Sequence, residues 1–235
     1  APKADTGDEL WSRAWEHYRK KQYEEAAKPM QLSAEKGHKW AQHYLGMMYY
    51  HGRGLDKNHK ESVKWIRKSA QQGIDKAQCQ LGYMYNHREG IDSAEYADAD
   101  KHALKWYHAS AEQDNDDAQN NLGYMYKYGF GVDSADYGEA LKWYRKSADR
   151  GHAQAQNNIG IMYEKGYGVE QSHEEARKWY MKSAEQGNSL GQNNLGVLYE
   201  KVFNDREMAI LWYRRAAKQG NEHAMANLEA MGESY

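Results

Sequence analysis

Histidines are the residues of this sequence best suited to acid–base or metal chemistry, and the chain has 11 of them. No H-E-x-x-H zinc motif occurs. His38, His43 and His51 lie near one another in the sequence, but their offsets of 5 and 8 residues do not align them on one helical face. No Ser/His/Asp or Cys/His arrangement is recognisable from spacing. We therefore predict no metal site and no catalytic residues, so the chain is not expected to be an enzyme.

Acidic residues gather in residues 87–103, HREGIDSAEYADADKHA. Clustered carboxylates suit calcium, yet this segment lacks the central glycine and final glutamate of the helix–loop–helix calcium pattern. A sister segment, GVDSADYGEA, repeats the Asp-Ser-Ala-acid-Tyr motif with fewer acids. We expect an acidic loop that is solvated or meets a basic patch on a partner, with calcium binding as the alternative. Its acids are Glu89, Asp92, Glu95, Asp98 and Asp100.

Two other features that could carry chemistry have structural explanations. The G-x-G loops, such as Gly52 with Gly54, lack the Lys-Ser/Thr of a phosphate-binding loop and follow an expected helix instead of a strand. They are typical of turns in which glycine supplies a positive φ. Cys79 is the single cysteine, so it has no partner for an intramolecular disulfide. It is either a semi-exposed thiol or a small filler on a helix surface, and no cofactor is predicted.

Composition and charge exclude two classes of partner. The 32 basic and 34 acidic residues leave a net charge of −2, whereas nucleic-acid binding needs a basic stripe. No apolar run approaches the roughly 18 residues that a membrane-spanning helix needs. With 2 prolines in 235 residues and abundant Ala, Lys, Glu, Gln, Leu and Met, the chain is expected to be almost wholly helical.

The sequence repeats itself. The stretch NNLGYMYKYGFGV, residues 120–132, returns 37 residues later as NNIGIMYEKGYGV. The apolar residue of the "LG" pair recurs at Leu45, Leu81, Leu122, Ile159 and Leu195, and a tryptophan at Trp65, Trp106, Trp143, Trp179 and Trp212. From each Trp to the next LG residue the count is always 16, whereas from LG to Trp it varies from 17 to 25. The variation is thus confined to the loop that carries the glycines.

Each repeat is predicted to form two helices. Residues 118–129 are predicted to form the first helix of a repeat, which we name helix A. Ala118, Leu122 and Tyr126 lie on one face of it. Residues 139–151 are predicted to form the second helix, which we name helix B, with Ala140, Trp143 and Ser147 on one face. Neither helix could bury its apolar stripe alone, but stacked pairs can. The predicted fold is all-α, a right-handed α-α superhelix (solenoid) of about six helix-pair repeats plus a C-terminal capping helix.

The pattern A-x-x-x-LG-x-M-Y-x-x-G-x-GV followed by A-x-x-WY-x-K-S-A-x-x-G resembles the Sel-1-like repeat, a relative of the tetratricopeptide repeat. The resemblance covers roughly residues 41–223, and residues 8–40 look like an ordinary tetratricopeptide unit. We expect a flexible segment 1–7 and a single domain 8–235, with units 8–40, 41–76, 77–117, 118–154, 155–190 and 191–223 and a cap 224–235.

Three positions depart from the repeat pattern. Pro29 stands where the other units place Trp, and it should kink or interrupt its helix. Arg88 replaces the first loop glycine of the second repeat. The fifth repeat, with YEKVFNDREMA, lacks both glycines.

The resemblance implies a scaffold whose concave face, lined by A helices, holds a partner protein. Bacterial members of this family are often exported, and the chain starts APKADTGDEL without Met, so we expect a periplasmic protein, with the cytoplasm as the alternative. Some members look like immunity proteins that neutralise lipase effectors of type VI secretion systems. Others, rich in cysteine, are described as β-lactam-binding or β-lactamase-like, which the single cysteine argues against. By itself the chain is expected to be a monomer.

The concave groove is predicted from the helix A positions that lie off the packing face. These positions fall two residues before each LG residue and then four and seven residues further on. Tyr, Asn and Met suit protein recognition, although the asparagines could instead serve packing and capping, because they recur with the repeat. The set is His43, Met47, Tyr50, Cys79, Tyr83, Asn86, Asn120, Tyr124, Lys127, Asn157, Ile161, Glu164, Asn193, Val197 and Glu200.

Overall fold

The computed structural model describes residues 5–234, and within them every regular element is a helix. The A helices are α1 (Gly7–Arg19), α3 (Lys39–His51), α5 (Asp75–Asn86), α7 (Asp116–Tyr128), α9 (Ala153–Lys165) and α11 (Ser189–Lys201). The B helices are α2 (Tyr23–Glu35), α4 (His59–Gln71), α6 (Ala99–Ala111), α8 (Tyr137–Asp149), α10 (His173–Glu185) and α12 (Arg206–Ala217). A short 3-10 helix, η1 (Ser93–Asp98), precedes α6, and α13 (Glu222–Ala230) follows the last pair. The predicted flexible segment lies outside the described residues as far as residue 4, and Thr6 already caps α1.

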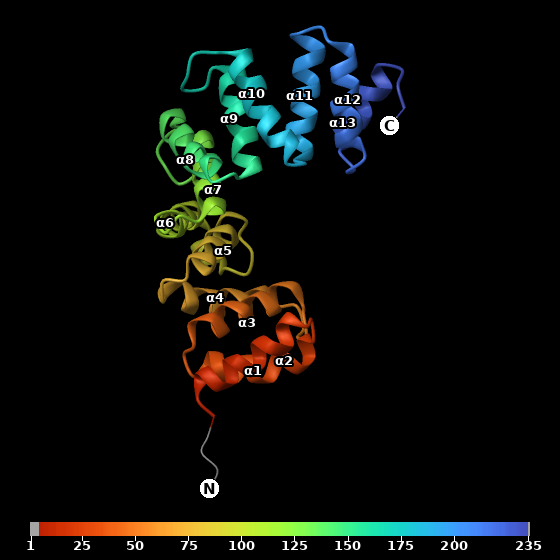
Figure 1. Ribbon diagram of the computed structural model, residues 1–235. Helices are drawn as coiled ribbons and strands as arrows, with labels where there is room; N and C mark the ends of the chain where they lie inside the picture. Colours follow the sequence, from red (N-terminus) through yellow and green to blue (C-terminus); the bar gives the residue numbers. More distant parts are fainter. Residues whose placement is uncertain (1–4, 235) are drawn as a thin grey trace. The chain divides into compact units, whose positions relative to one another are not determined.

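The chain divides into two compact units. The first extends to Ala118 and takes in Phe130–Asp133, and the second comprises Gln119–Gly129 and the residues from Ser134 onward. In the first unit each helix from α1 to α6 packs on the next one along the chain, and in the second unit the same holds from α8 to α13 (Figure 1). This succession of helix pairs closed by a final helix confirms the predicted all-α solenoid.

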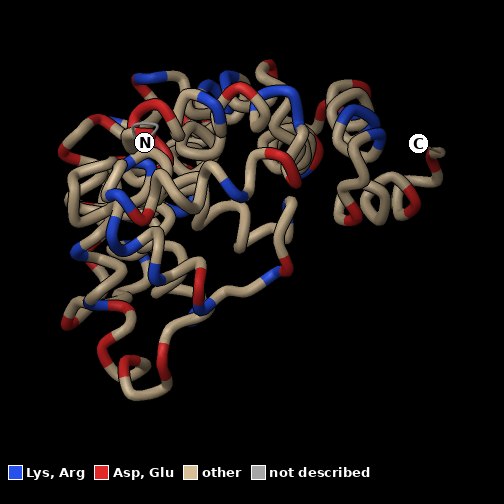
Figure 2. The backbone as a smooth tube through the Cα atoms, turned by 90° about the horizontal axis from the view of Figure 1, so that it is seen from below, with Lys and Arg blue, Asp and Glu red and all other residues tan. Residues whose placement is uncertain are grey.

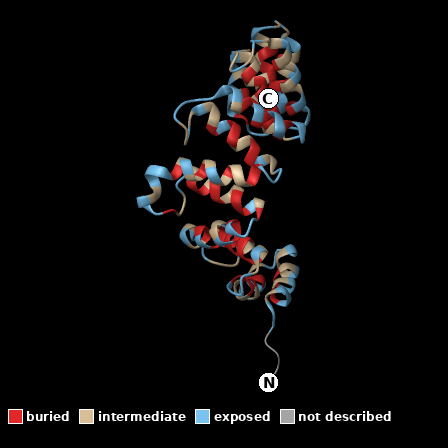
Figure 3. Cartoon of the chain, turned by 90° about the vertical axis from the view of Figure 1, so that its left-hand side faces the viewer, coloured by how far each residue is buried: buried red, intermediate tan, exposed pale blue. Residues whose placement is uncertain are grey.

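The glycine of each LG pair marks the closest approach of helix A to helix B. A Cβ atom on Gly160 would lie 2.5 Å from the ring of Tyr180, so the ring lies directly against the helix backbone. The same contact joins Gly82 to Tyr107, Gly123 to Tyr144 and Gly196 to Tyr213, and in the first repeat Ile66 replaces the ring opposite Gly46. These tyrosines are among the largest fully buried side chains of the described chain. Helix faces turned toward their neighbours are buried and the opposite faces are exposed (Figure 3).

In four repeats a glutamine beside the LG motif ties the A helix to the preceding B helix. Gln156 donates its Nε2–H to the Ala148 carbonyl at 3.4 Å, and its Oε1 accepts from Gln186 at 2.7 Å. Equivalent pairs of bonds are made by Gln42, Gln78 and Gln192. All four side chains are buried, and satisfied buried amides fix the register between helices because an unmatched one is costly.

The loop glycines adopt the positive φ expected of them. Gly54 has φ 68°, and a Cβ atom there would lie 2.2 Å from the Tyr23 carbonyl oxygen, so the loop runs directly over the start of the preceding B helix. Arg88, which replaces a glycine, still takes φ 55°. Its guanidinium donates to the Asp100 carboxylate at 3.0 and 3.2 Å and to the Asn86 carbonyl at 2.8 Å. These charge-assisted bonds offset the strain of the left-handed backbone.

Of the two effects expected of Pro29, a kink or an interruption, the interruption does not occur. The α2 helix runs unbroken from Tyr23 to Glu35 with Pro29 inside it. A proline within a helix costs about 3 kcal/mol, but Ala26, Met30 and Ala34 on the same helix are almost fully buried. The packing of these residues holds α2 together across the lost hydrogen bond.

Replacing Gly160 by Ala should destabilise the protein by about 1–3 kcal/mol, because the new methyl group would overlap the Tyr180 ring. Gly138→Ala is the matched control, since Gly138 also lies in a helix but meets only the Asp136 carboxylate at 3.3 Å. The control should be neutral or slightly stabilising. Urea midpoints followed by circular dichroism measure both, and equal midpoints for the two variants would contradict the close-approach argument.

Candidate partner-binding surface

The predicted groove residues fall into three rows, each with one member on α3, α5, α7, α9 and α11. The first row, two residues before each LG position, is His43, Cys79, Asn120, Asn157 and Asn193. The second row, two residues after it, is Met47, Tyr83, Tyr124, Ile161 and Val197. The third row, five residues after it, is Tyr50, Asn86, Lys127, Glu164 and Glu200. The rows differ sharply in what their side chains do.

The asparagines of the first row join successive repeats. Asn158 donates to the Asn120 side-chain oxygen at 2.9 Å, and Asn194 donates to Asn157 at 2.9 Å. Asn227 of α13 donates in the same way to Asn193 at 3.2 Å. Asn157 and Asn193 are 2 % and 8 % exposed, so they offer a partner little surface. The asparagines therefore serve packing between repeats, the alternative that the sequence left open. The sequence signal for this role is the "NN" doublet, in which one asparagine accepts and the next donates.

Burial keeps both His43 and Cys79 uncharged at neutral pH. Burial lowers the pKa of His43 to about 4, assisted by the nearby Lys76 charge, and its Nδ1 has no hydrogen-bond partner in the described chain. Burial also raises the pKa of the Cys79 thiol to about 12. At neutral pH the imidazole is therefore uncharged and the thiol is protonated, which removes its nucleophilicity. Together with Met47 and Lys76 they line a hollow of about 400 Å³.

The third row is mostly occupied by contacts within the protein. Glu164 and Glu200 accept the hydroxyl hydrogens of the buried Tyr180 and Tyr213 at 2.7 and 2.8 Å. Desolvation, with the adjacent carboxylate, raises the pKa of both tyrosines. In the first unit Tyr50 donates to Glu89 at 2.7 Å and Asn86 to Asp100 at 3.4 Å.

The second row differs from the other two because all five members are apolar or aromatic. Tyr124 is 44 % exposed, and the other four members are half-buried. Ile161 and Val197 also pack at the edge of a hydrophobic core cluster. Apolar side chains that solvent reaches, one per repeat and at the same helical position, are the features expected of a contact surface.

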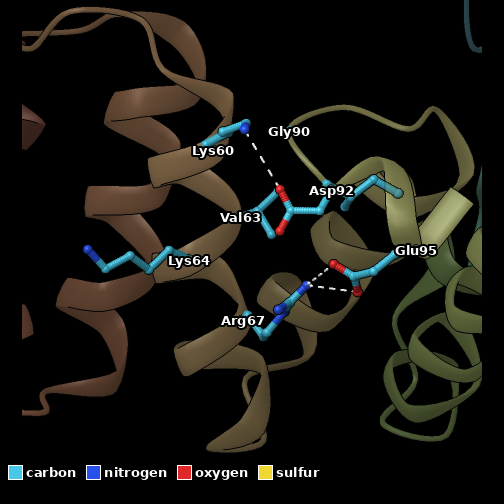
Figure 4. Close-up of a pocket in the computed structure, with 8 residues that line it drawn as sticks. Lys60, Val63, Lys64, Arg67, Gly90, Asp92 and Glu95 are labelled. Atoms are coloured by element: carbon cyan, nitrogen blue, oxygen red, sulfur yellow. Dashed lines mark hydrogen bonds and ion pairs between the residues drawn. The ribbon is translucent and has the colours of Figure 1, made fainter.

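The acidic loop is bound to its own unit. Arg67 of α4 donates to both Glu95 oxygens at 3.3 Å, and Lys60 lies 3.7 Å from Asp92 across a hollow of about 180 Å³ (Figure 4). Glu95 also accepts from the Tyr85 hydroxyl at 2.6 Å, which helps to keep the pKa of this carboxyl low.

The remaining acids of the loop pair separately, Glu89 with Tyr50, Asp98 with Lys101 and Asp100 with Arg88. Among residues 5–234 no three His, Cys, Asp or Glu side chains are grouped to hold a metal ion. Asp92 and Asp98 are the most open of these pairs, with side chains 75 % and 59 % exposed.

Charge and hydropathy can also be followed along the described residues. Basic and acidic residues are both spread along the backbone that Figure 2 colours, and acids outnumber bases locally in the acidic loop. Across the described residues, no helix combines the length and the apolar character that crossing a membrane requires.

Comparison with known proteins identifies the repeat. A family model described as Sel1 repeat matches residues 41–74, 75–115, 116–152, 153–188 and 189–221. No match was found among curated proteins.

Several solved structures are similar. A Sel1 repeat protein from Oxalobacter formigenes is 32 % identical with a TM-score of 0.82, over 94 % of this chain and 86 % of that one. A protective antigen of uropathogenic Escherichia coli with an SLR fold is 36 % identical with a TM-score of 0.75, over 89 % of this chain. The match spans 44 % of the antigen's own length. An immunity protein from Pseudomonas aeruginosa, 18 % identical with a TM-score of 0.57 over 90 % of this chain and 83 % of that one, shares the fold.

Removing one asparagine that donates to a first-row asparagine should weaken the contact between successive repeats. Asn194→Ala leaves the buried Asn157 oxygen without this partner, which should cost about 1–3 kcal/mol. Asn158→Ala at the preceding junction should cost less, because its acceptor Asn120 is half-buried. Urea midpoints of both variants test this, and no loss for Asn194→Ala would show that the bond contributes nothing.

His43 should make the protein acid-sensitive. Its folded-state pKa of about 4 lies below the ordinary value of 6.5, so the stability it contributes is present above pH 6.5 and is lost as pH falls toward 4, by up to about 3 kcal/mol. His43→Asn, which installs the residue of the later repeats, should flatten this part of the stability profile. Urea midpoints at pH 7 and pH 5 give the comparison, and an equal loss in both proteins would assign the acid sensitivity to other groups.

Proposed function

Because this chain belongs to the Sel1 repeat family, we propose that it is a non-catalytic scaffold that binds a partner protein through the exposed side of its A helices. The observation that carries this proposal is the second row. Its members are Met47, Tyr83, Tyr124, Ile161 and Val197, and they recur at one helical position while the rows on either side are largely occupied by internal contacts.

The side-chain types of the second row suit protein recognition. Tyrosine and methionine are enriched in the buried centres of protein interfaces, and tyrosine supplies a large contact area at a small cost in side-chain entropy. Within each unit the A helices follow one another through the stacked pairs. A partner can therefore contact several members at once, which is how solenoid proteins commonly bind.

The states of the reactive groups support a non-catalytic role. The Cys79 thiol is protonated, His43 is buried and neutral, and the carboxylates of the acidic loop pair with cations and tyrosines of the same unit. A catalytic nucleophile or general base needs a pKa near the working pH and a position within reach of a substrate, and these groups do not combine the two.

Finer assignments of partner and location belong to the proposal. The scaffold is proposed to act as a monomer, to belong to a bacterium and to be exported. The bacterial sources of the similar structures support the bacterial origin. The immunity-protein alternative gains no support from individual residues, because the likeness to such proteins is one of fold. The β-lactam alternative is disfavoured by the single, protonated cysteine.

Replacing Tyr83 by Ala, alone and together with Tyr124→Ala, should weaken partner binding without unfolding the protein. Both rings reach solvent and neither belongs to the buried core, so the loss should be at least about tenfold in affinity if they lie at the centre of the interface. Affinity capture from a lysate of the native host, with quantitative mass spectrometry, compares the variants with the wild type.

The matched control is Leu211→Ala, since Leu211 is 41 % exposed on the B helix α12. It should retain the partner. Equal capture by Tyr83→Ala, the double variant and the wild type would reject the second row as the contact surface.

A further inference from the structure

A hollow lined by aromatic rings lies in the second unit, apart from most of the surface discussed so far. It is formed where α7 ends, α8 begins and α9 leads into its loop, and its volume is about 210 Å³. Its lining is Lys127, Tyr128, Tyr137, Ile161, Lys165 and Tyr167, which we call the aromatic hollow. Small-molecule sites are commonly about 300–1,000 Å³, so this volume suits one side chain better than a whole ligand.

The rings of the aromatic hollow are unusually exposed. Tyr128 is 52 % and Tyr137 is 37 % exposed, and both are among the few large apolar or aromatic residues of the described chain to be so open to solvent. The Tyr137 ring stacks on Tyr167 with centroids 4.8 Å apart and planes 10° from parallel. Exposed aromatic groups of this kind mark contact sites, because covering their faces is favourable.

Tyr137 is held in place from both sides. The Asp136 side chain accepts the Glu139 backbone N–H at 2.9 Å, which fixes the start of α8 next to the tyrosine. The loop of the following repeat lies against its backbone, since a Cβ atom on Gly168 would come within 2.9 Å of the Tyr137 Cβ. The backbone that carries the Tyr137 ring is thus fixed on both sides, which lowers the entropy cost of binding at this ring.

The hollow also carries an uncompensated positive charge. The Lys127 ammonium lies 4.9 Å from the centroid of Tyr128 and 5.8 Å from that of Tyr167. Among the residues that the structure describes, no carboxylate lies within ion-pair distance of it. Lys165, by contrast, pairs with Glu164 at 2.6 Å. The rings of Tyr128 and Tyr167 thus hold the Lys127 ammonium group at the edge of the aromatic hollow without neutralising its charge.

We propose that the aromatic hollow binds an acidic segment of a partner protein. An aromatic or long aliphatic side chain of that segment packs against Tyr128, Tyr137 and Tyr167, and a neighbouring carboxylate pairs with Lys127. Charge complementarity selects this occupant, because Lys127 is the one charge of the lining without an opposite charge beside it among the described residues. The inference rests on the proposed scaffold function and names the chemistry of the partner.

Fluorescence anisotropy with three labelled peptides tests the inference on the full chain. The probes are S-D-E-F-D-E-S, the same peptide with Ala for Phe, and S-K-R-F-K-R-S. The first should bind at least about tenfold more tightly than the other two, and added salt should weaken it, because the ion pair is exposed. Equal binding of all three peptides, or none by the first, overturns the proposal.

Two variants locate the binding. Lys127→Gln and Tyr128→Ala should each weaken binding of the first peptide by about fivefold or more, with unchanged melting temperatures. Lys182→Gln is the matched control, because its ammonium also lies over a ring, 4.0 Å from the centroid of Trp179 on α10. If Lys182→Gln loses as much peptide affinity as Lys127→Gln, the effect comes from the net charge of the protein, which would overturn the proposal.

The same variants separate this inference from the proposed function. A partner that the wild type and Lys127→Gln both capture, but Tyr83→Ala loses, leaves the scaffold function standing and overturns the aromatic hollow as its site. Failure of the wild type to capture any partner counts against the scaffold function, whereas peptide binding would still support the hollow. A dimer in sedimentation that Lys127→Gln abolishes would assign the hollow to a second copy of the chain and overturn the partner named here.

Discussion

The rest of the structure depends on the contact between a glycine of helix A and a buried ring of helix B. Because Gly160 has no side chain, the Tyr180 ring can lie against the helix backbone, and the hydroxyl of that ring reaches Glu164 on the same A helix. Small residues on the two helices of this repeat, Ala155 on α9 and Ala176 on α10, are both fully buried. Small residues at close approaches and large rings beside them give the dense packing of a protein interior.

Once the helices are this close, buried polar groups set the register between them. The Gln156 amide bridges a carbonyl of one B helix and the side chain of the next, while Asn157 accepts from the following A helix. These bonds are directional, so they permit one alignment where apolar packing alone would tolerate several. Tyr83 and Tyr124 lie outside the buried core, which leaves both rings to the proposed partner surface.

Much of the fold could be predicted because the spacing has a direct physical cause. Trp143 and Ile159 are 16 residues apart, as the corresponding pair is in every repeat, because one B helix, a tight turn and half an A helix allow no variation. Loops can vary, so the segment between Leu81 and Trp106 absorbs an acidic insertion with its own 3-10 helix. Pro29 does not interrupt α2, because burial of its neighbours outweighs the local cost of a proline within a helix. Packing by Asn157 was one of the alternatives that the repeat suggested. Its donor Asn194 and the bond from Tyr180 to Glu164 could not be foreseen, because these partners lie on other helices and spacing does not reveal which side chain donates.

The asparagine junction has a consequence for how such a chain can change its length. The bond from Asn158 to Asn120 and the bond from Asn194 to Asn157 have the same donor, acceptor and length, and α13 ends the series with Asn227 on Asn193. Any one of these donors therefore fits any one of these acceptors. Duplication or loss of a whole repeat would re-form a junction that already exists, so the array can grow or shrink in units of one repeat without inventing a new interface.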